Sequence, residues 1–166
     1  TNGKSTTTAL IGHLLSNARR DVQVGGNLGV PVLDLEPMDE AGSYVLEMSS
    51  YQLELTHSMA FDIALLLNLS ADHLDRHGDM DGYISAKKRI FSAQASGHTA
   101  IVGIDDASSR AVYEELKKSG QQKIIGVSGE KIVLGGIYVQ AGVLCDDTGE
   151  GSADAVFDLS QIATLP

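Results

Sequence analysis

The chain opens on a glycine-lysine-serine motif that runs directly into a helical pattern. The motif matches the second half of a phosphate-binding P-loop and reads Thr1-Asn2-Gly3-Lys4-Ser5-Thr6. In such a loop the glycine lets backbone amides approach phosphate oxygens, the lysine reaches the β and γ phosphates, and the serine hydroxyl can ligate Mg²⁺. The apolar pattern over residues 6–16 predicts a helix whose positive N-terminus faces a nucleotide. We therefore expect ATP to bind at residues 1–6, in a chain cut inside this loop; the alternative is an ordinary helix capped by a Gly-Lys-Ser turn.

The composition restricts the partners and the cellular compartment. At 166 residues the chain suits a single domain, and its 22 acidic and 12 basic residues give a net charge of -10. This charge argues against a nucleic-acid partner or an anionic membrane surface. Cys145 is the one cysteine, which excludes an internal disulfide and fits a reducing cytoplasm. We expect a cytoplasmic protein that needs neither nucleic acid nor a membrane.

Strand-like and helix-like segments alternate along most of the chain. The expected strands are residues 23–24, 44–46, 63–67, 100–102 and 124–127, and the expected helices are residues 6–16, 50–56, 80–95 and 108–118. This alternation predicts an α/β fold in which a mostly parallel sheet is flanked by helices on both faces. Ligands of such sheets bind at the carboxyl ends of the strands.

The last part of the chain has a different pattern. Short apolar runs at residues 131–134, 137–140, 143–145 and 155–159 are separated by glycine-containing turns. This pattern is typical of antiparallel hairpins. We expect a core over residues 1–130 and a small antiparallel β appendage over residues 131–160, with a solvated turn over residues 146–154.

A glutamate stands at the end of a buried-type strand. Glu47 follows Tyr44-Val45-Leu46 and precedes a run with helical character, Ser49-Ser50-Tyr51-Gln52. A carboxylate at the tip of a strand beside a P-loop is placed to hold Mg²⁺. The alternative is a helix-capping region with Ser50 at the cap.

Two histidines follow the next strand, four residues apart. His73 and His77 would share a metal if both lay on one helix, although a solvated loop also explains such a pair. His73 is the stronger candidate because it follows a strand end. We expect His77 to be structural or a hydrogen-bond donor.

A lysine falls on the apolar face of the helix expected over residues 80–95. Lys87 shares that face with Tyr83 and Ile90, while Arg89 points the opposite way and is expected to matter less. A lysine in this position commonly extends its amine to the surface. The alternative is a desolvated lysine with a lowered pKa, whose free amine is available for chemistry.

Taken together, these motifs closely resemble the ATP-dependent Mur ligases of bacterial cell-wall synthesis. The resemblance rests on the P-loop run and on four further segments, namely Gly25-Gly26-Asn27-Leu28-Gly29, residues 46–53, residues 72–77 and residues 83–90. Within the family, the first of these segments and the run Glu47-Met48-Ser49-Ser50-Tyr51-Gln52-Leu53 resemble the branch that adds D-glutamate. The resemblance is strong up to Phe91 and looser beyond it.

The resemblance implies a role for each candidate residue. Lys4, Glu47, His73 and Lys87 would be catalytic, and Thr1, Asn2, Gly3, Lys4, Ser5 and Thr6 would bind ATP. One Mg²⁺ would be held by Ser5 and Glu47, and a second by His73 and by Lys87 as an N-carboxylated lysine. Asn27 and Ser49 would contact the substrate, UDP-N-acetylmuramoyl-L-alanine. Gly103 departs from the family, whose members often carry asparagine there.

The resemblance also implies a reaction and a domain organisation. Family members phosphorylate a substrate carboxylate and let the amine of an amino acid, here D-glutamate, attack the acyl phosphate. We expect the chain to be the central ATPase domain over residues 1–166, ending at Pro166 without the UDP-binding and C-terminal domains and inactive alone. The alternatives are another Mur ligase, a folylpolyglutamate-synthase-like enzyme or a non-catalytic nucleotide-binding module. A GTPase is excluded because no Asn-Lys-x-Asp run occurs.

Overall fold

The chain forms two compact units, each with its own sheet. The computed structural model describes residues 1–149 and 151–162. The first unit consists of Thr1–His57 and Asp72–Arg89, and the second of Ser58–Ala71 and the described residues from Ile90 onward. The sequence predicts a different boundary, between a core over residues 1–130 and a β appendage over residues 131–160. That boundary stays a prediction. Glu150, inside the expected turn, and Pro166, the expected end of the domain, lie outside the described residues.

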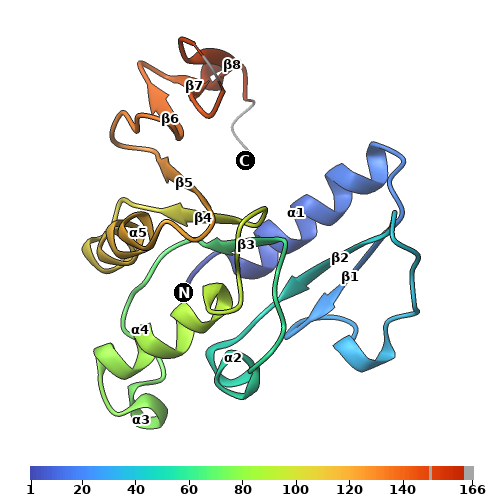
Figure 1. Cartoon of the computed structure of the whole chain (residues 1–166). Helices are drawn as coiled ribbons and strands as arrows, with labels where there is room; N and C mark the ends of the chain where they lie inside the picture. The colour runs from blue at the N-terminus through green and yellow to red at the C-terminus, as the bar shows by residue number, and fades with distance from the viewer. Residues whose placement is uncertain (150, 163–166) are drawn as a thin grey trace. The chain divides into compact units, whose positions relative to one another are not determined.

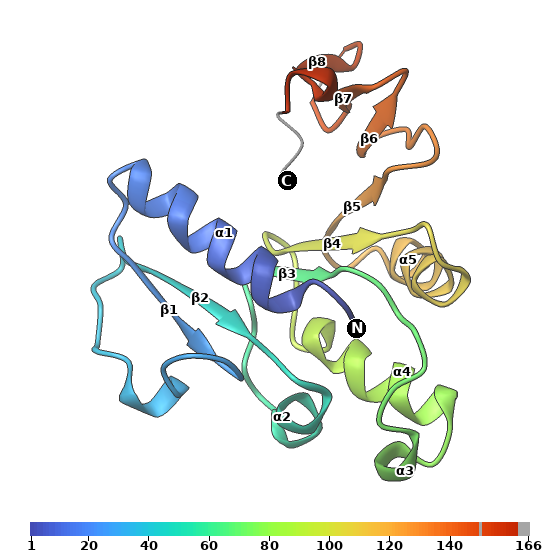
Figure 2. The ribbon, with the colours of Figure 1, turned by 180° about the vertical axis from the view of Figure 1, so that it is seen from behind.

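A parallel strand pair and one long helix form the first part of the first unit. Strand β1 (Val22–Gly26) pairs in parallel with β2 (Ser43–Glu47), and helix α1 (Lys4–Asn17) packs against both (Figures 1 and 2). Glycine inside a helix costs about 1 kcal/mol relative to alanine. Gly12 is explained by this packing, because a Cβ there would lie 2.3 Å from Cγ2 of Val24. The glycine lets α1 lie close on the sheet.

Three short helices complete the first unit. Helix α2 (Ser50–Leu55) and helix α3 (Leu74–His77) both pack against α4 (Met80–Lys88), which continues as the 3-10 turn η2 (Arg89–Phe91). The prediction of one helix over residues 80–95 is wrong at its C-terminal end. In the second unit, the buried Gln94 side chain donates to the carbonyls of Phe61 (2.8 Å) and Thr99 (3.0 Å), which holds the chain in a turn towards the next strand.

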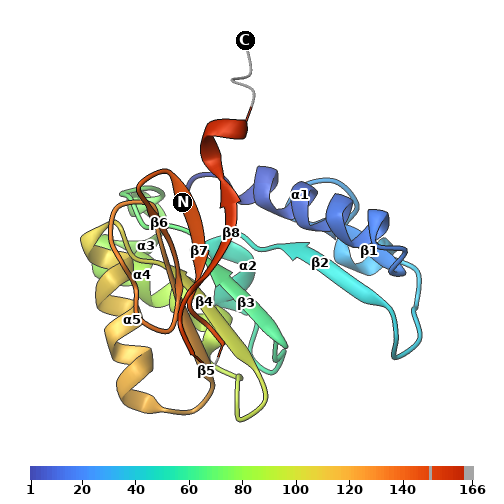
Figure 3. The same cartoon turned by 90° about the horizontal axis from the view of Figure 1, so that it is seen from above.

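The second unit is built on a six-stranded sheet. The strands lie in the order β3 (Ile63–Leu66), β4 (Thr99–Gly103), β5 (Lys123–Ser128), β6 (Ile137–Gln140), β7 (Val143–Asp146) and β8 (Asp154–Asp158), as Figure 1 shows. Figure 3 shows the same sheet from above. The first four strands are parallel and the last two pairings are antiparallel. Helix α5 (Ala107–Ser119) packs on β4 and β5 through its buried face. The predicted α/β fold, with a mostly parallel sheet and antiparallel strands at its C-terminal end, is confirmed.

One of the four predicted C-terminal strands does not form. Residues 131–134 are not a strand, because the hydroxyl of Ser128 accepts from the backbone amides of Glu130 (3.1 Å) and Lys131 (2.9 Å) and turns the chain. The remaining runs continue the main sheet, since β6 pairs with β5. A 3-10 turn, η3 (Leu159–Gln161), ends β8 one residue before the predicted end.

Gly103 ends β4 at a point of very close backbone contact. A Cβ at this position would lie 2.1 Å from the carbonyl oxygen of Leu67, which follows β3. No side chain fits at that distance without a shift of the backbone. In this chain the glycine therefore allows β3 and β4 to end side by side.

Candidate functional site

A buried carboxylate ends the strand pair of the first unit. Glu47 is the last residue of β2 and is 4% exposed. Its Oε1 accepts a hydrogen bond from Nδ2 of Asn27 (3.2 Å), while its Oε2 is buried and has no hydrogen-bond partner among the described residues. An ionised oxygen is costly to bury without a partner. The site around Glu47 is therefore suited to a cation.

The glycines beside Asn27 allow its loop to reach Glu47. Gly26 has a φ of 110°, and a Cβ there would lie 2.2 Å from the carbonyl oxygen of Glu47. That same carbonyl accepts from the amide of Asn27 (2.7 Å). Asn27 thus contacts Glu47 through both its backbone and its side chain.

The start of α1 has the features of a phosphate-binding helix terminus. Gly3 caps the helix with a φ of 80°, in the left-handed region that favours glycine, and contributes no side chain to the cap. The helix begins at Lys4 rather than at the predicted residue 6, and exposes Ser5 and Thr6 in its first turn. Unpaired amides and the helix dipole make such an end attractive to anions. Lys4 Nζ donates to the carbonyl of Thr1 (2.8 Å), which keeps the ammonium beside the loop.

Lys87 is buried in the first unit. It is 5% exposed, and its Nζ lies 5.6 Å from the centre of the Tyr83 ring. Burial lowers the pKa of Lys87 to about 8, and the positive charge of Lys4 acts in the same direction, while the charges of Asp72 and Glu47 oppose the shift. The alternative of a lysine that extends its amine to the surface is therefore wrong. Lys4 and Glu47 are thus near enough for their charges to act on the amine of Lys87.

His73 does not lie on a helix with His77. It caps α3 in the left-handed conformation, with a φ of 52°, so the alternative of two metal ligands on successive turns is wrong. Its Nδ1 is 3.4 Å from the hydroxyl of Tyr51, and its Nε2 is 3.6 Å from Oδ2 of Asp72. Over residues 1–149 and 151–162, no three His, Cys, Asp or Glu side chains gather closely enough to hold a metal ion. Mg²⁺ commonly combines only one or two carboxylates with substrate phosphates and water, so this finding is compatible with a role for Glu47.

His77 belongs to an aromatic cluster that no sequence pattern indicates. Its Nε2 lies 3.0 Å from the buried hydroxyl of Ser50, and its ring packs 5.6 Å from Tyr83 and 5.8 Å from Tyr51. This contact confirms the expected structural or hydrogen-bonding role of His77. Burial is the main cause that raises the pKa of Tyr83, so its phenol stays neutral near pH 7.

The cap of α2 is Ser49 rather than Ser50. Gln52 N donates to Ser49 Oγ (3.3 Å), and Ser49 N donates to Gln52 Oε1 (2.9 Å), which together form a capping box. The alternative with Ser50 at the cap is wrong in that residue, because the Ser50 hydroxyl is buried against His77. The spacing of serine and glutamine was the sequence signal for the correct cap. Any substrate contact by Ser49 would add to this structural role.

Arg89 holds the C-terminal end of α2. Its Nε donates to the carbonyl of Leu53 (2.8 Å), and its Nη2 donates to the carbonyl of Thr56 (3.0 Å) and lies 2.8 Å from Nδ1 of His57. These contacts give Arg89 a structural role, and the expectation that it matters less to the site than Lys4 and Glu47 stays a prediction. A cation suits this place, since the last carbonyls of a helix carry partial negative charge.

Replacing Arg89 with alanine should therefore destabilise the fold. We expect Arg89→Ala to lower the free energy of unfolding by about 2 kcal/mol, because part-buried carbonyls lose charged donors. Denaturant unfolding of the full-length protein measures this. Arg20→Ala, which removes an exposed arginine, is the matched control and should change the free energy by less than about 0.5 kcal/mol. Equal stability of the two variants would contradict the structural role of Arg89.

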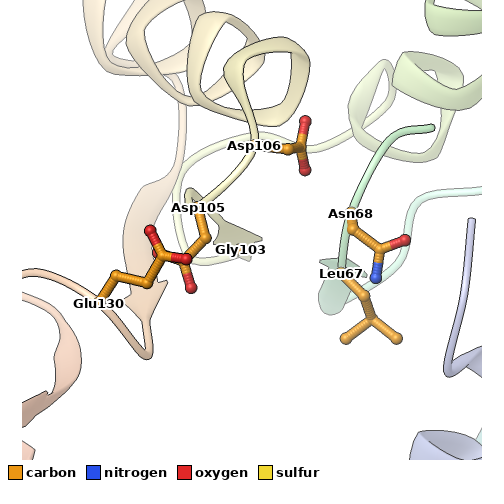
Figure 4. Close-up of a pocket in the computed structure, with 6 residues that line it drawn as sticks. All are labelled: Leu67, Asn68, Gly103, Asp105, Asp106 and Glu130. Atoms are coloured by element: carbon orange, nitrogen blue, oxygen red, sulfur yellow. The ribbon is translucent and has the colours of Figure 1, made fainter.

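The second unit contains a separate acidic cavity of about 430 Å³ at the carboxyl ends of β3, β4 and β5. Its lining consists of Leu67, Asn68, Gly103, Asp105, Asp106 and Glu130. Figure 4 shows Asp105 and Glu130 together on one side, with Leu67 and Asn68 on the other.

The two aspartates of this cavity are engaged by the protein itself. Asp105 accepts from the hydroxyl of Ser128 and from the amide of Gly129. Burial alone would raise the pKa of Asp106, but hydrogen bonds from Ser109, Leu69 and Ser108 outweigh it and lower the pKa. Both carboxylates therefore serve to join loops at the ends of the strands.

Comparison with known proteins places the chain in a family. Residues 1–145 match the family described as the Mur ligase middle domain. A protein of Rhodospirillum rubrum named UDP-N-acetylmuramoylalanine--D-glutamate ligase is 53% identical over 166 residues, which are 100% of this chain and 35% of that protein. The protein of the same name from Caulobacter vibrioides is 52% identical, with the same coverage of both chains. The chain thus spans about a third of the length of these curated relatives.

Solved structures show the same fold. The MurF ligase of Thermotoga maritima in complex with ADP has a TM-score of 0.61 at 23% identity, over 87% of this chain and 35% of that one. A UDP-N-acetylmuramoyl-L-alanyl-D-glutamate--2,6-diaminopimelate ligase has a TM-score of 0.63 at 24% identity, over 95% of this chain and 37% of that one. Among the described residues, no helix is long and apolar enough to cross a bilayer. Because the family match covers most of its length, the chain belongs to the Mur ligase middle domain family.

Proposed function

We propose that the full-length protein is an ATP-dependent amide ligase that adds D-glutamate to UDP-N-acetylmuramoyl-L-alanine in the cytoplasm, for peptidoglycan synthesis. This chain would be its ATP-binding domain. The choice of substrates is supported by relatives named D-glutamate ligases at 53% and 52% identity. The observation that carries the proposal is the buried Oε2 of Glu47, which has no hydrogen-bond partner within residues 1–149 and 151–162 and whose charge, like that of Lys4, acts on Lys87.

The nucleotide would lie at the start of α1. Residues 1–6 would surround its phosphates, with Lys4 neutralising their charge and the amides of the first turn binding their oxygens. Ser5 and Glu47 would hold one Mg²⁺, which fits a buried carboxylate oxygen that no described residue hydrogen-bonds. When bound, the ion would neutralise the charge that builds up on the transferred phosphoryl group.

His73 and Lys87 would hold a second Mg²⁺. As an ammonium, Lys87 would repel a cation, whereas the carbamate formed by its neutral amine and CO₂ is an anion with oxygen ligands. Support for the carbamate comes from the burial of Lys87 and from the lack of a carboxylate within ion-pairing distance of it in the part of the chain that the structure describes. The imidazole of His73 is a less suitable ligand, because Tyr51 and Asp72 already face its nitrogens.

The chemistry follows from the poor reactivity of a carboxylate towards amines. The γ-phosphoryl group of ATP would pass to the carboxylate of UDP-N-acetylmuramoyl-L-alanine, with ADP as the leaving group. The amine of D-glutamate would then attack the acyl carbon and expel phosphate. Asn27 and Ser49 would orient the substrate, and Lys4 would stabilise the charge on the phosphoryl group during transfer.

The proposal is tested by phosphate release from the full-length protein supplied with ATP, Mg²⁺ and UDP-N-acetylmuramoyl-L-alanine. We expect release that depends on D-glutamate and is at least about 100-fold slower with L-glutamate, because one site must hold the amine in line with the acyl carbon. Release that depends instead on another amino acid, or on a folate with glutamate, would favour the alternative ligases. We expect this chain alone to release none, which would leave it a nucleotide-binding module.

A further inference from the structure

Tyr83 connects three parts of the candidate site. It is 1% exposed and stands one helical turn before Lys87 in α4. Its hydroxyl is 3.1 Å from Oγ1 of Thr1, a residue 82 positions earlier in the chain. Its ring lies 5.6 Å from Nζ of Lys87 and 5.6 Å from the ring of His77.

The contact with Thr1 extends to the lysine of the phosphate loop. The carbonyl of Thr1 accepts a hydrogen bond from Nζ of Lys4 (2.8 Å). A side chain that holds Thr1 in place therefore also limits where the ammonium of Lys4 can lie. Tyr83 is therefore linked to Lys4 through Thr1, and its ring lies beside the amine of Lys87.

We propose that Tyr83 is a positioning residue, whose hydroxyl holds the phosphate loop in its nucleotide-binding conformation through Thr1. The ring would fill its space equally well as phenylalanine, so packing alone does not account for the hydroxyl. A buried hydroxyl is costly unless it is hydrogen-bonded, and Thr1 supplies the partner. The kinetic part of this inference rests on the proposed function, whereas the effect on nucleotide affinity does not.

The test is Tyr83→Phe in the full-length protein, with ADP affinity measured by calorimetry. We expect the Kd of ADP to rise about 5- to 10-fold, as for the loss of one hydrogen bond. The KM of ATP should rise to a similar extent while kcat and the KM of D-glutamate stay within about 2-fold, because only the nucleotide side is affected. Tyr113→Phe is the matched control. Tyr113 is also buried, at 6% exposed, and its ring centre also lies near a lysine amine, 5.2 Å from Nζ of Lys117, but it belongs to the second unit. This control should leave the Kd unchanged.

A double-mutant cycle with Thr1→Val identifies the contact responsible. If the hydroxyl acts through Thr1, the combined variant should bind ADP no more weakly than the weaker single variant. Additive losses, or an unchanged Kd in Tyr83→Phe, would overturn the proposal. The proposal would also be overturned if Tyr83→Phe had a lower melting temperature and if kcat, the KM of ATP and the KM of D-glutamate all worsened to the same extent. That result would indicate a purely structural role. If the protein adds no D-glutamate, the proposed function fails while the ADP cycle still decides the role of Tyr83.

Discussion

Replacing Glu47 with glutamine in the full-length protein should lower kcat about 100-fold or more, as expected for a group that stabilises charge in the transition state. Glutamine keeps the shape of the side chain and can still accept from Asn27, but it carries no charge for a cation. The melting temperature should be unchanged or higher, because a neutral amide replaces a buried charge whose Oε2 has no partner among the described residues, and a neutral group costs less to bury. Steady-state phosphate release and thermal unfolding measure the two effects.

The control for this variant is Glu40→Gln, which changes an exposed glutamate in the same unit. It should keep both the activity and the stability. Lys4→Ala should lower kcat to an extent similar to Glu47→Gln, since the loop would lose the ammonium that we propose neutralises the phosphates. Near-normal turnover of either site variant at saturating Mg²⁺ would show that the nucleotide site has been assigned wrongly.

Lys87→Ala should be nearly inactive and should recover part of its activity when acetate or another short carboxylate is added. The truncation removes a buried side chain and leaves a space in the site. If Lys87 acts as a carbamate, a small carboxylate in that space would restore the missing oxygen ligands. Phosphate release titrated with acetate and formate measures the recovery.

Two comparisons separate this recovery from a general salt effect. Lys118→Ala, at an exposed lysine of α5, should be fully active and should not respond to acetate. Chloride at the same ionic strength should not restore Lys87→Ala, since it offers no oxygen ligands. The carbamate would be refuted if no short carboxylate restored activity and if a crystal structure of the active, nucleotide-bound protein showed an unmodified lysine.

Local patterns were sufficient to predict the fold class and the elements on which several candidate site residues lie. The P-loop run and the apolar helix after it are contiguous in the sequence, and the structure has helix α1 beginning at Lys4. The apolar run before Glu47 likewise predicted a strand with a carboxylate at its tip, which β2 confirms. These features depend on residues within one or two turns of each other, and such features are readable from periodicity and spacing.

Long-range contacts decided what the sequence pattern left open. Arg89 matters because α4 places it against the last carbonyls of α2, more than 30 positions earlier in the chain. Helix α4 is shorter than the helix predicted over residues 80–95, because the side chain of Gln94 hydrogen-bonds to the carbonyl of Phe61, more than 30 positions earlier. Residues 131–134 form no strand, because the hydroxyl of Ser128 accepts hydrogen bonds from the amides of Glu130 and Lys131.

The same reason applies to the chemistry of the site. Periodicity placed Lys87 on an apolar face, but only packing showed that its amine is buried and that its pKa is lowered. Nor does any motif join Tyr83 to Thr1, whose hydroxyls meet across 82 positions. Burial and charge proximity depend on which segments fold against each other, so these properties of the site were decided by the tertiary structure and not by the local sequence.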